Sequence, residues 1–370
     1  MSSLASTKDP FIRIAKRESI PNWKAWLIRF AAIASALVIC AVIIYLIVRM
    51  NPIKVYQTMF NGAFGSEKRI WVTIRDCMML LCVGVGLAPA FKMRFWNIGA
   101  EGQILVGGIA TAACMIYAGN ALPNWLLLII MIVVSCVCGA AWAYLPALFK
   151  SKWNTNETLF TLMMNYIAIQ LTSFFVAVWE NPYGSNSVGI INQSTKKGWF
   201  PSLFGEQYML NFLLVMSLVL AMYLYLKYSK HGYEIAVVGS SPNTARYAGI
   251  SVGKVYIRTM LISGAICGLA GFLAVAGASH TISVNTAGGR GFTAIIVAWL
   301  AKFNTLMMLL ISLLLVFLEK GAMEIASQYN LNDYASEMIT GIILFFILGS
   351  EFFIQYRVIF RGRTGKEAVK

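Results

Sequence analysis

Long apolar runs with few charges divide this chain, and they limit its fold more than any other feature. The run at 30–48 contains no charged residue and is about 19 residues long, enough for a helix to cross roughly 30 Å of hydrocarbon. Of the 370 residues, 59% are hydrophobic and only 12% are charged, whereas soluble domains have about 25% charged residues. The sequence therefore predicts an all-α polytopic membrane protein.

About ten membrane-spanning helices follow from the positions of these runs. Both chain ends are expected in the cytoplasm, because about 21 of the 30 Lys and Arg residues then lie in inner segments. The predicted spans lie at about 30–48, 71–91, 95–117, 125–149, 158–178, 209–226, 255–278, 292–302, 304–319 and 336–354.

The segments between the spans complete the predicted organisation. A transmembrane domain at 25–356 lies between two basic cytoplasmic tails, 1–24 and 357–370, and the first tail has room for a short interfacial helix. An amphipathic external helix is expected at 50–70. The longest external segment, which contains turn-forming Pro and Gly residues, is expected at 179–208.

Charge and composition exclude several classes of function. The net charge of +15 does not indicate nucleic-acid binding, because cytoplasmic loops of membrane proteins are themselves basic. The seven cysteines lie in or beside apolar runs and are interpreted as small buried hydrophobic residues. His231 and His280 are the only histidines, so no histidine-built metal site and no cofactor are expected.

The stretch 95–103 combines an acid, two amides and two glycines between apolar runs. Asn97, Glu101 and Gln103 are costly groups inside a membrane unless they have partners, so a functional role is expected. Because the basic turn 92–94 lies beside it, the stretch is placed at the inner end of its span and not at the bilayer centre. Two roles stay open: Glu101 braces the broken start of its own helix by accepting from free backbone N–H groups, or it contacts substrate together with Gln103.

A weak internal repeat is visible in the starts of four predicted spans. The two halves run in opposite directions across the membrane, which predicts an inverted-topology repeat with the substrate path between the halves. In the span at 255–278, Gly264, Gly268 and Gly271 predict close helix packing. The repeated residues are Asn156 and Glu157 with Asn332 and Asp333, and Gly99 and Gly102 with Gly289 and Gly291.

Four segments together resemble one family of membrane proteins. They cover roughly residues 50–350 in order, and their combination is specific where a single motif would be weak. The segments are 62–66 (GAFGS), 97–103 (NIGAEGQ), 156–167 (NETLFTLMMNYI) and 289–298 (GRGFTAIIVA). The chain is similar to ABC-importer permeases of the branched-chain amino acid, sugar and nucleoside superfamily, and it is most like the nucleoside-type permeases.

This resemblance implies a permease that forms the translocation path of an ATP-driven importer in the bacterial cell membrane, with nucleosides as the expected substrate. The implied partners are a cytoplasmic ABC ATPase, a second permease subunit that is homologous or identical, an extracellular substrate-binding protein and membrane lipid. ATP hydrolysis is expected on the partner, because the chain has no G-x-x-x-x-G-K-[ST] motif. The chain itself is therefore expected to be a transport subunit and not an enzyme.

The segment 227–254 is the candidate contact with the ATPase. A short capped helix is predicted within it, because Ser241 suits an N-cap, Pro242 the first helical position and Gly249 the C-terminal stop. Given the resemblance, this rigid element is expected to transmit closure of the ATPase to the spans; the alternative is an ordinary inner loop. The candidate coupling residues are Ser241, Pro242, Asn243, Ala245, Arg246 and Gly249.

The candidates for the substrate path are polar or aromatic residues near the motifs. Each can line the path or brace neighbouring helices, and aromatic residues such as Trp96 and Trp299 can stack on a base or pack against one another. Arg290 can dock the binding protein or anchor the chain at the membrane interface. The path or bracing candidates are Asn97, Glu101, Gln103, Asn156, Glu157, Asn165 and Phe292.

Two other functions stay open at this point. A sugar or branched-chain amino acid permease of the same superfamily would share these motifs. An ion-driven secondary carrier would need no ATPase. An intramembrane enzyme is not supported, because no paired catalytic constellation can be assembled from the sequence.

Overall fold

The computed structural model describes most of the chain and divides it into two compact units, each described here by itself. One unit is Ser66–Phe317, and the other combines Met1–Gly65 with Leu318–Lys370. Much of both predicted tails, and Asn332 of the predicted repeat, lie outside the described residues. The described residues are 12–16, 21–48, 51–330 and 333–360.

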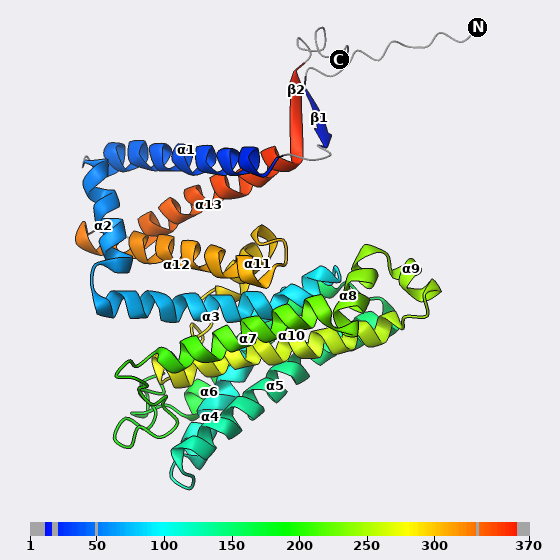
Figure 1. Ribbon diagram of the computed structural model, residues 1–370. Coiled ribbons are helices and arrows are strands. Elements are labelled where there is room, and N and C mark those ends of the chain that lie inside the picture. Colours follow the sequence, from blue (N-terminus) through cyan, green and yellow to red (C-terminus); the bar gives the residue numbers. More distant parts are fainter. Residues whose placement is uncertain (1–11, 17–20, 49–50, 331–332, 361–370) are drawn as a thin grey trace. The chain divides into compact units, whose positions relative to one another are not determined.

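The unit Ser66–Phe317 is built from helices (Figure 1). Polar side chains at the N-cap positions stabilise the starts of two of these helices. Ser66 Oγ accepts from the Arg69 N–H at 3.3 Å, and Asn156 Oδ1 accepts from the Leu159 N–H at 3.2 Å. The helices are α3 (Glu67–Lys92), α4 (Ala100–Ala118), α5 (Asn124–Trp153), α6 (Glu157–Val178), α7 (Met209–Tyr228), α8 (Lys230–Ser240), α9 (Pro242–Tyr247), α10 (Val252–Ala274) with the π-helical end Val275–Ser279, α11 (Arg290–Leu300) and α12 (Thr305–Gln328) as far as Phe317.

Helix α10 is central in this unit and lies along α5, α4 and α3 (Figure 1). The backbones approach closely at glycines, as the sequence predicts. A Cβ at Gly264 or Gly268 would meet the backbone of α5 at Gly139, and one at Gly271 would meet the Ile104 carbonyl of α4. Small residues are therefore required along this face of α10.

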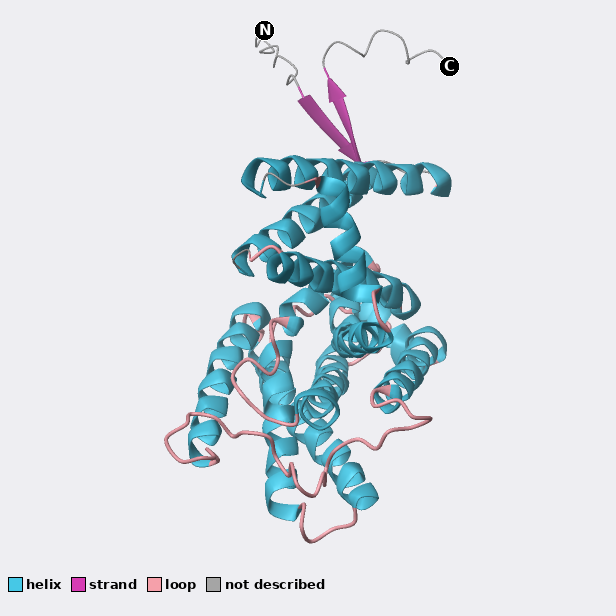
Figure 2. Ribbon diagram, turned by 90° about the vertical axis from the view of Figure 1, so that its left-hand side faces the viewer, coloured by secondary structure: helices cyan, strands magenta, loops and turns pink. Residues whose placement is uncertain are grey.

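The other unit contains α1 (Asn22–Val48), α2 (Pro52–Phe64), α13 (Asp333–Gln355) and a two-stranded antiparallel sheet of β1 (Ile12–Lys16) and β2 (Tyr356–Phe360). Helix α1 packs against α13, and Figure 2 shows the two strands side by side. The expectation of an interfacial helix in the first tail is wrong for 12–16. The backbone groups of these residues pair with 356–360, a partner that local sequence does not reveal.

Each of the ten predicted spans corresponds to a helix, but the number of crossings is not confirmed. Among the described residues, seven helices are long and apolar enough to cross a membrane: α3, α4, α5, α6, α7, α10 with its π-helical end, and α12. Helix α11 has 11 residues, which gives a length of about 16 Å, too short to cross a hydrocarbon core of about 30 Å alone. The chain is a multi-pass helical membrane protein that includes a helix of half-span length.

Candidate functional site

The start of α4 is the first part of the candidate site. The chain turns after Lys92, where Arg94 adopts a left-handed backbone (φ +58°), and residues 93–99 are largely non-helical. The N-cap position, Gly99, has no side chain with which to cap the helix, and its own N–H donates to Asn97 Oδ1 at 3.1 Å. Buried backbone N–H groups at a helix start require partners, and here they come from other helices.

Two side chains of α6 supply those partners. Asn165 Oδ1 accepts from the Gly102 N–H at 2.9 Å, and Asn165 Nδ2 donates to the Ile98 carbonyl at 2.9 Å. One turn earlier, Thr161 Oγ1 accepts from the Ile98 N–H at 3.2 Å. Thr161 is not among the sequence candidates, although its spacing of four residues from Asn165 places both on one helix face.

A third group of bonds joins the amides of the motif to α10. Asn97 Oδ1 accepts from Gln103 Nε2 at 3.2 Å, and Asn97 Nδ2 donates to Ser263 Oγ of α10 at 3.2 Å. Asn97 is 0% exposed, Gln103 1% and Asn165 3%. These three candidates therefore form one buried network with partners inside the chain. Together with Glu101 they are called the motif network, which comprises Asn97, Glu101, Gln103 and Asn165.

Glu101 connects this network to α11 rather than to its own helix. Its Oε1 accepts from the Gly289 N–H at 2.7 Å and its Oε2 from the Gly291 N–H at 2.8 Å. A carboxylate at a helix N-terminus satisfies free donors and interacts favourably with the helix dipole. The expectation that Glu101 caps the start of α4 is thus corrected, because the partner donors lie almost two hundred residues further along the chain. Glycine is required at 291, since a Cβ there would contact the Glu101 backbone.

The helix that Glu101 binds packs against α3. Helix α11 lies along α3, with Arg290 near Asp76 at one end and Val297 against Gly84 further on. Both contacts fall in the middle of α3, which runs from Glu67 to Lys92. Through Gly289 and Gly291, Glu101 in the first turn of α4 is therefore joined to a helix that packs along the middle of α3.

The remaining path candidates lie apart from the motif network. Asn156 is exposed and caps α6, whereas Glu157 forms an ion pair with Lys150 at 2.9 Å. Phe292 is 45% exposed in the first turn of α11. The Trp96 ring stacks on the Trp299 ring, with centroids 5.3 Å apart and planes at 21°. These two rings pack against each other, as one of the two open interpretations expects.

The candidate coupling segment contains two helices where the sequence predicts one. The capped helix is present as α9: Ser241 Oγ accepts from the Thr244 N–H at 3.2 Å, and Gly249 follows it with φ +75°, a conformation that favours glycine. Arg246 donates to Asn243 Oδ1 at 3.0 Å, and Ala245 is fully buried. Helix α8 was not predicted, because 230–240 lacks a long apolar run.

A pocket of about 300 Å³ opens beside these two short helices and the start of α10. An ion pair crosses it, with Arg258 Nη2 2.8 Å from Glu234 Oε2. The hydrogen bond from Arg258 lowers the pKa of Glu234 below its usual value. Lys230 and Lys254 also line this pocket, so it is basic overall.

The long segment 179–208 is held against the ends of α4 and α10. The Ile191 N–H donates to the His280 carbonyl at 2.8 Å, and Asn192 Nδ2 donates to the Met115 carbonyl at 2.8 Å. The Trp199 ring stacks on the His280 imidazole with centroids 3.8 Å apart and planes at 4°. Burial lowers the pKa of His280, which favours the neutral ring.

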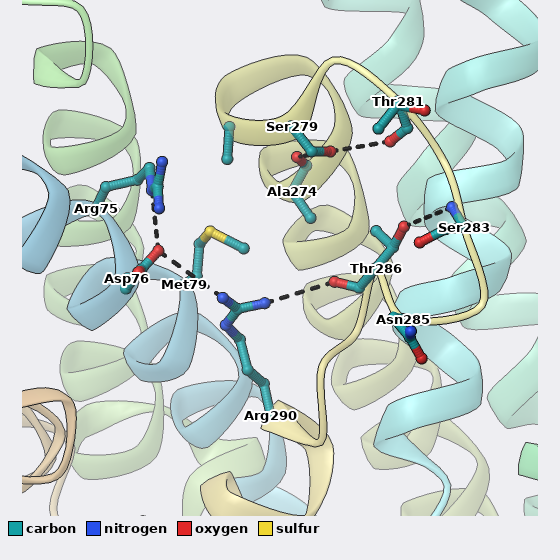
Figure 3. Close-up of a pocket in the computed structure, with 11 residues that line it drawn as sticks. Arg75, Asp76, Met79, Ala274, Ser279, Thr281, Ser283, Asn285, Thr286 and Arg290 are labelled. Atoms are coloured by element: carbon teal, nitrogen blue, oxygen red, sulfur yellow. Dashed lines mark hydrogen bonds and ion pairs between the residues drawn. The ribbon is translucent and has the colours of Figure 1, made fainter. Parts of the chain in front are cut away.

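A second pocket, of about 240 Å³, is next to the two glycines that bind Glu101, because Arg290 between them lines it. Asp76 of α3 and Arg290 of α11 lie beside each other in its lining, and residues of 279–286 form another part of it (Figure 3). Arg75 and Asp76 are not among the candidates that the sequence suggests. Two adjacent charged residues inside an apolar run are the signal that could have identified them as site candidates.

A helical bundle with several apolar spans, and with helices that begin within the bundle at a buried polar network, is typical of multi-pass membrane transport proteins. The chain belongs to the family described as the permease component of the branched-chain amino acid transport system, whose model matches residues 70–348. The family match includes most of the motif segments and covers more than half of the chain.

Three relatives show the range of substrates named within this group. The chain is 28% identical to a glucose ABC transporter permease protein of Haloferax volcanii, covering 96% of both chains. It is 29% identical to a guanosine ABC transporter permease protein of Bacillus subtilis, covering 80% of this chain and 85% of that one. It is 27% identical to a nucleoside ABC transporter permease protein of Lactococcus lactis, covering 82% and 86%.

The chain is therefore an ABC transporter permease, a multi-pass plasma-membrane protein that is a transport component and not an enzyme. Membership of this family sets aside the ion-driven carrier. Permease components of ABC importers work in general with an ATPase and a binding protein.

Proposed function

We propose that this chain forms the translocation path of an ATP-driven importer for nucleosides. The observation that carries the proposal is that the motif 97–103, whose wording is most like nucleoside-type permeases, also joins the starts of α4 and α11 through Glu101. Relatives named for guanosine and for nucleosides support the same substrate class. Import of a sugar is the second candidate, favoured by the glucose-named relative that covers 96% of both chains.

In this proposal the motif network braces two broken helices. Each of α4 and α11 follows a long helix and a non-helical segment, and each begins at glycines. Glu101, in the first turn of α4, accepts from the N–H groups of Gly289 and Gly291 at the start of α11, and this pairing of two helix starts supports an inverted-topology repeat in the bundle. The network holds the starts of α4 and α11 together while the surrounding helices move.

The segment 227–254 is proposed to contact the cytoplasmic ATPase. Helix α8 packs on α3, α7 and α10, so a push on α8 or α9 is transmitted to three spans. The basic pocket beside α9 offers positive charge to an acidic partner surface. A second permease subunit and an extracellular binding protein complete the proposed importer.

Uptake of labelled substrates tests the substrate class. Cells that contain the ATPase, the second permease and the binding protein are compared with and without this chain. Uptake of labelled guanosine or uridine is expected only when the chain is present. Glucose uptake that depends on the chain, without nucleoside uptake, would establish the sugar alternative instead.

The proposed coupling role of α9 is tested by a variant in which this helix carries a flexible insertion. A Gly-Ser pair inserted after Arg246 is expected to abolish uptake and leave ATP hydrolysis insensitive to substrate, because a flexible joint cannot transmit the push of the ATPase. The control is the same insertion after Gly184, where nothing lies within 4 Å of the added Cβ position. Normal uptake with the insertion at Arg246, in protein that reaches the membrane, would contradict the coupling role.

A further inference from the structure

We propose that the pocket between Asp76 and Arg290 is a subsite of the translocation path that takes the vicinal hydroxyl groups of a ribose or hexose ring. This inference rests on the proposed import of a nucleoside or sugar and names the part of the substrate that the pocket recognises. The pocket is formed within one compact unit, by α3, the end of α10, the rim at 279–286 and the first residue of α11 (Figure 3).

Arg290 is held loosely at this pocket. Its Nη2 lies 3.8 Å from Asp76 Oδ1, which is beyond hydrogen-bond distance, and its Nη1 lies 3.5 Å from the Thr286 carbonyl, at the limit. A guanidinium has five N–H donors in a planar fork. A bound group with acceptor oxygens would therefore gain stronger hydrogen bonds than Arg290 makes within the chain.

Asp76 supplies the complementary chemistry. Its Oδ1 accepts from Arg75 Nε at 2.9 Å and lies 3.8 Å from Arg290 Nη2 (Figure 3). An ionised carboxylate only accepts hydrogen bonds and a guanidinium only donates them, whereas each hydroxyl of a diol does both. Two adjacent hydroxyls can thus donate to Asp76 and accept from Arg290 at the same time.

The size and the walls of the pocket favour a sugar ring. Its volume of about 240 Å³ is below the roughly 300–1,000 Å³ typical of sites that enclose a drug-sized ligand, so it suits one ring of a nucleoside rather than the whole molecule. Met79, Ala274 and Ala278 contribute apolar groups to the lining, and Ser279, Thr281 and Thr286 contribute hydroxyl groups. A sugar ring presents the same combination of C–H groups and hydroxyls.

A network residue sets the position of Arg290. Glu101 holds the N–H groups of Gly289 and Gly291 on either side of Arg290, so the guanidinium projects from a fixed backbone. Arg290 therefore lines the pocket from a fixed position. An amino acid zwitterion would also offer opposite charges to Asp76 and Arg290, and it is the competing ligand, although it would leave the hydroxyl-lined rim unused.

The test compares uptake of uridine, 2′,3′-dideoxyuridine, glucose and leucine by cells with the complete importer. Asp76→Asn is expected to lower uridine uptake about tenfold while changing dideoxyuridine uptake little, because only the diol loses a charged acceptor. If glucose is the substrate, glucose uptake falls instead. Glu67→Gln, at the exposed start of the same helix, is the matched control and is expected to leave all uptake unchanged. For a nucleoside importer, an unchanged ratio of uridine to dideoxyuridine uptake would overturn the inference. For a glucose importer, unchanged glucose uptake would overturn it, and in either case so would a selective loss of leucine uptake.

A labelling experiment tests whether this pocket binds a diol, independently of transport. Ala278→Cys places a thiol at the pocket wall, and 10 mM uridine or ribose is expected to slow its modification by a small thiol reagent several-fold in intact membranes, with the unaltered chain as the background. Equal slowing by dideoxyuridine, or no slowing by any of these compounds, would exclude diol recognition here. If protection is seen with ribose while the cells take up no nucleoside, the subsite stands and the proposed nucleoside import fails.

Discussion

The motif network and the pocket beside it are both lined by polar side chains, but Glu101 and Asn165 in the network make shorter hydrogen bonds than Arg290 makes in the pocket. In the network, Glu101 and Asn165 accept from backbone N–H groups at distances of 2.7 to 2.9 Å. In the pocket, Arg290 lies 3.8 Å from Asp76 and 3.5 Å from the Thr286 carbonyl. The two regions meet at the start of α11, where Arg290 lies between Gly289 and Gly291, whose N–H groups donate to Glu101.

This difference separates two roles for polar groups in a membrane protein. A buried group whose hydrogen bonds are short and complete loses free energy when it changes partner, so it stabilises one arrangement of the helices. A group with long and incomplete bonds can exchange them for a ligand at low cost. The network is therefore expected to respond to mutation mainly through stability, and the pocket mainly through transport.

The largest loss of stability is expected for Glu101→Ala. Two backbone N–H groups of α11 would be left buried without acceptors, at a cost of about 2–5 kcal/mol in the free energy of unfolding. Glu101→Gln should lie between this variant and the unaltered chain, because one amide oxygen remains as an acceptor. Thermal unfolding in detergent, followed by the loss of monodisperse protein, measures the effect. A Glu101→Ala protein as stable as a Glu67→Ala control would contradict the bracing role.

A smaller loss of stability is expected for Asn165→Ala in α6, and a still smaller one for Asn156→Ala at the N-cap of the same helix. Asn165→Ala removes partners from the Gly102 N–H and the Ile98 carbonyl and should cost about 1–3 kcal/mol. Asn156→Ala removes an exposed N-cap, whose backbone donors can turn to water, and should cost about 1 kcal/mol. The pair shares one residue type and one substitution, so equal melting temperatures would show that the buried network adds nothing to stability.

In the pocket, the expected change in stability is smaller than in the motif network and similar to that of Asn156→Ala. Asp76→Asn keeps an oxygen that can accept from Arg75, and both arginines border the pocket, so the cost should be about 1 kcal/mol. The same unfolding measurement, made on the variant used for uptake, gives the value. A loss as large as that of Glu101→Ala would place Asp76 among the bracing residues and remove the contrast between the two regions.

Several elements could be predicted because their causes are local. The caps and the glycine stop of α9 lie within nine residues, 241–249, and the close packing of α10 follows from Gly264 and Gly268 on one face. The apolar runs predict a helix in each of ten places because length and hydropathy act within a single segment. Helix α8 was not predicted, because 230–240 has no long apolar run and the helix is stabilised by packing on three other helices.

The motif at 97–103 shows where local sequence stops being sufficient. The sequence by itself determined that this is a multi-pass helical membrane protein of a permease family and that Glu101 needs a partner. Only the tertiary structure decided which donors Glu101 meets, that the helix it binds packs along α3, that β1 pairs with β2, and that Asp76 and Arg290 share a pocket. The physical reason is that capping and helix periodicity act over a few residues, whereas these partners are brought together only when distant helices pack.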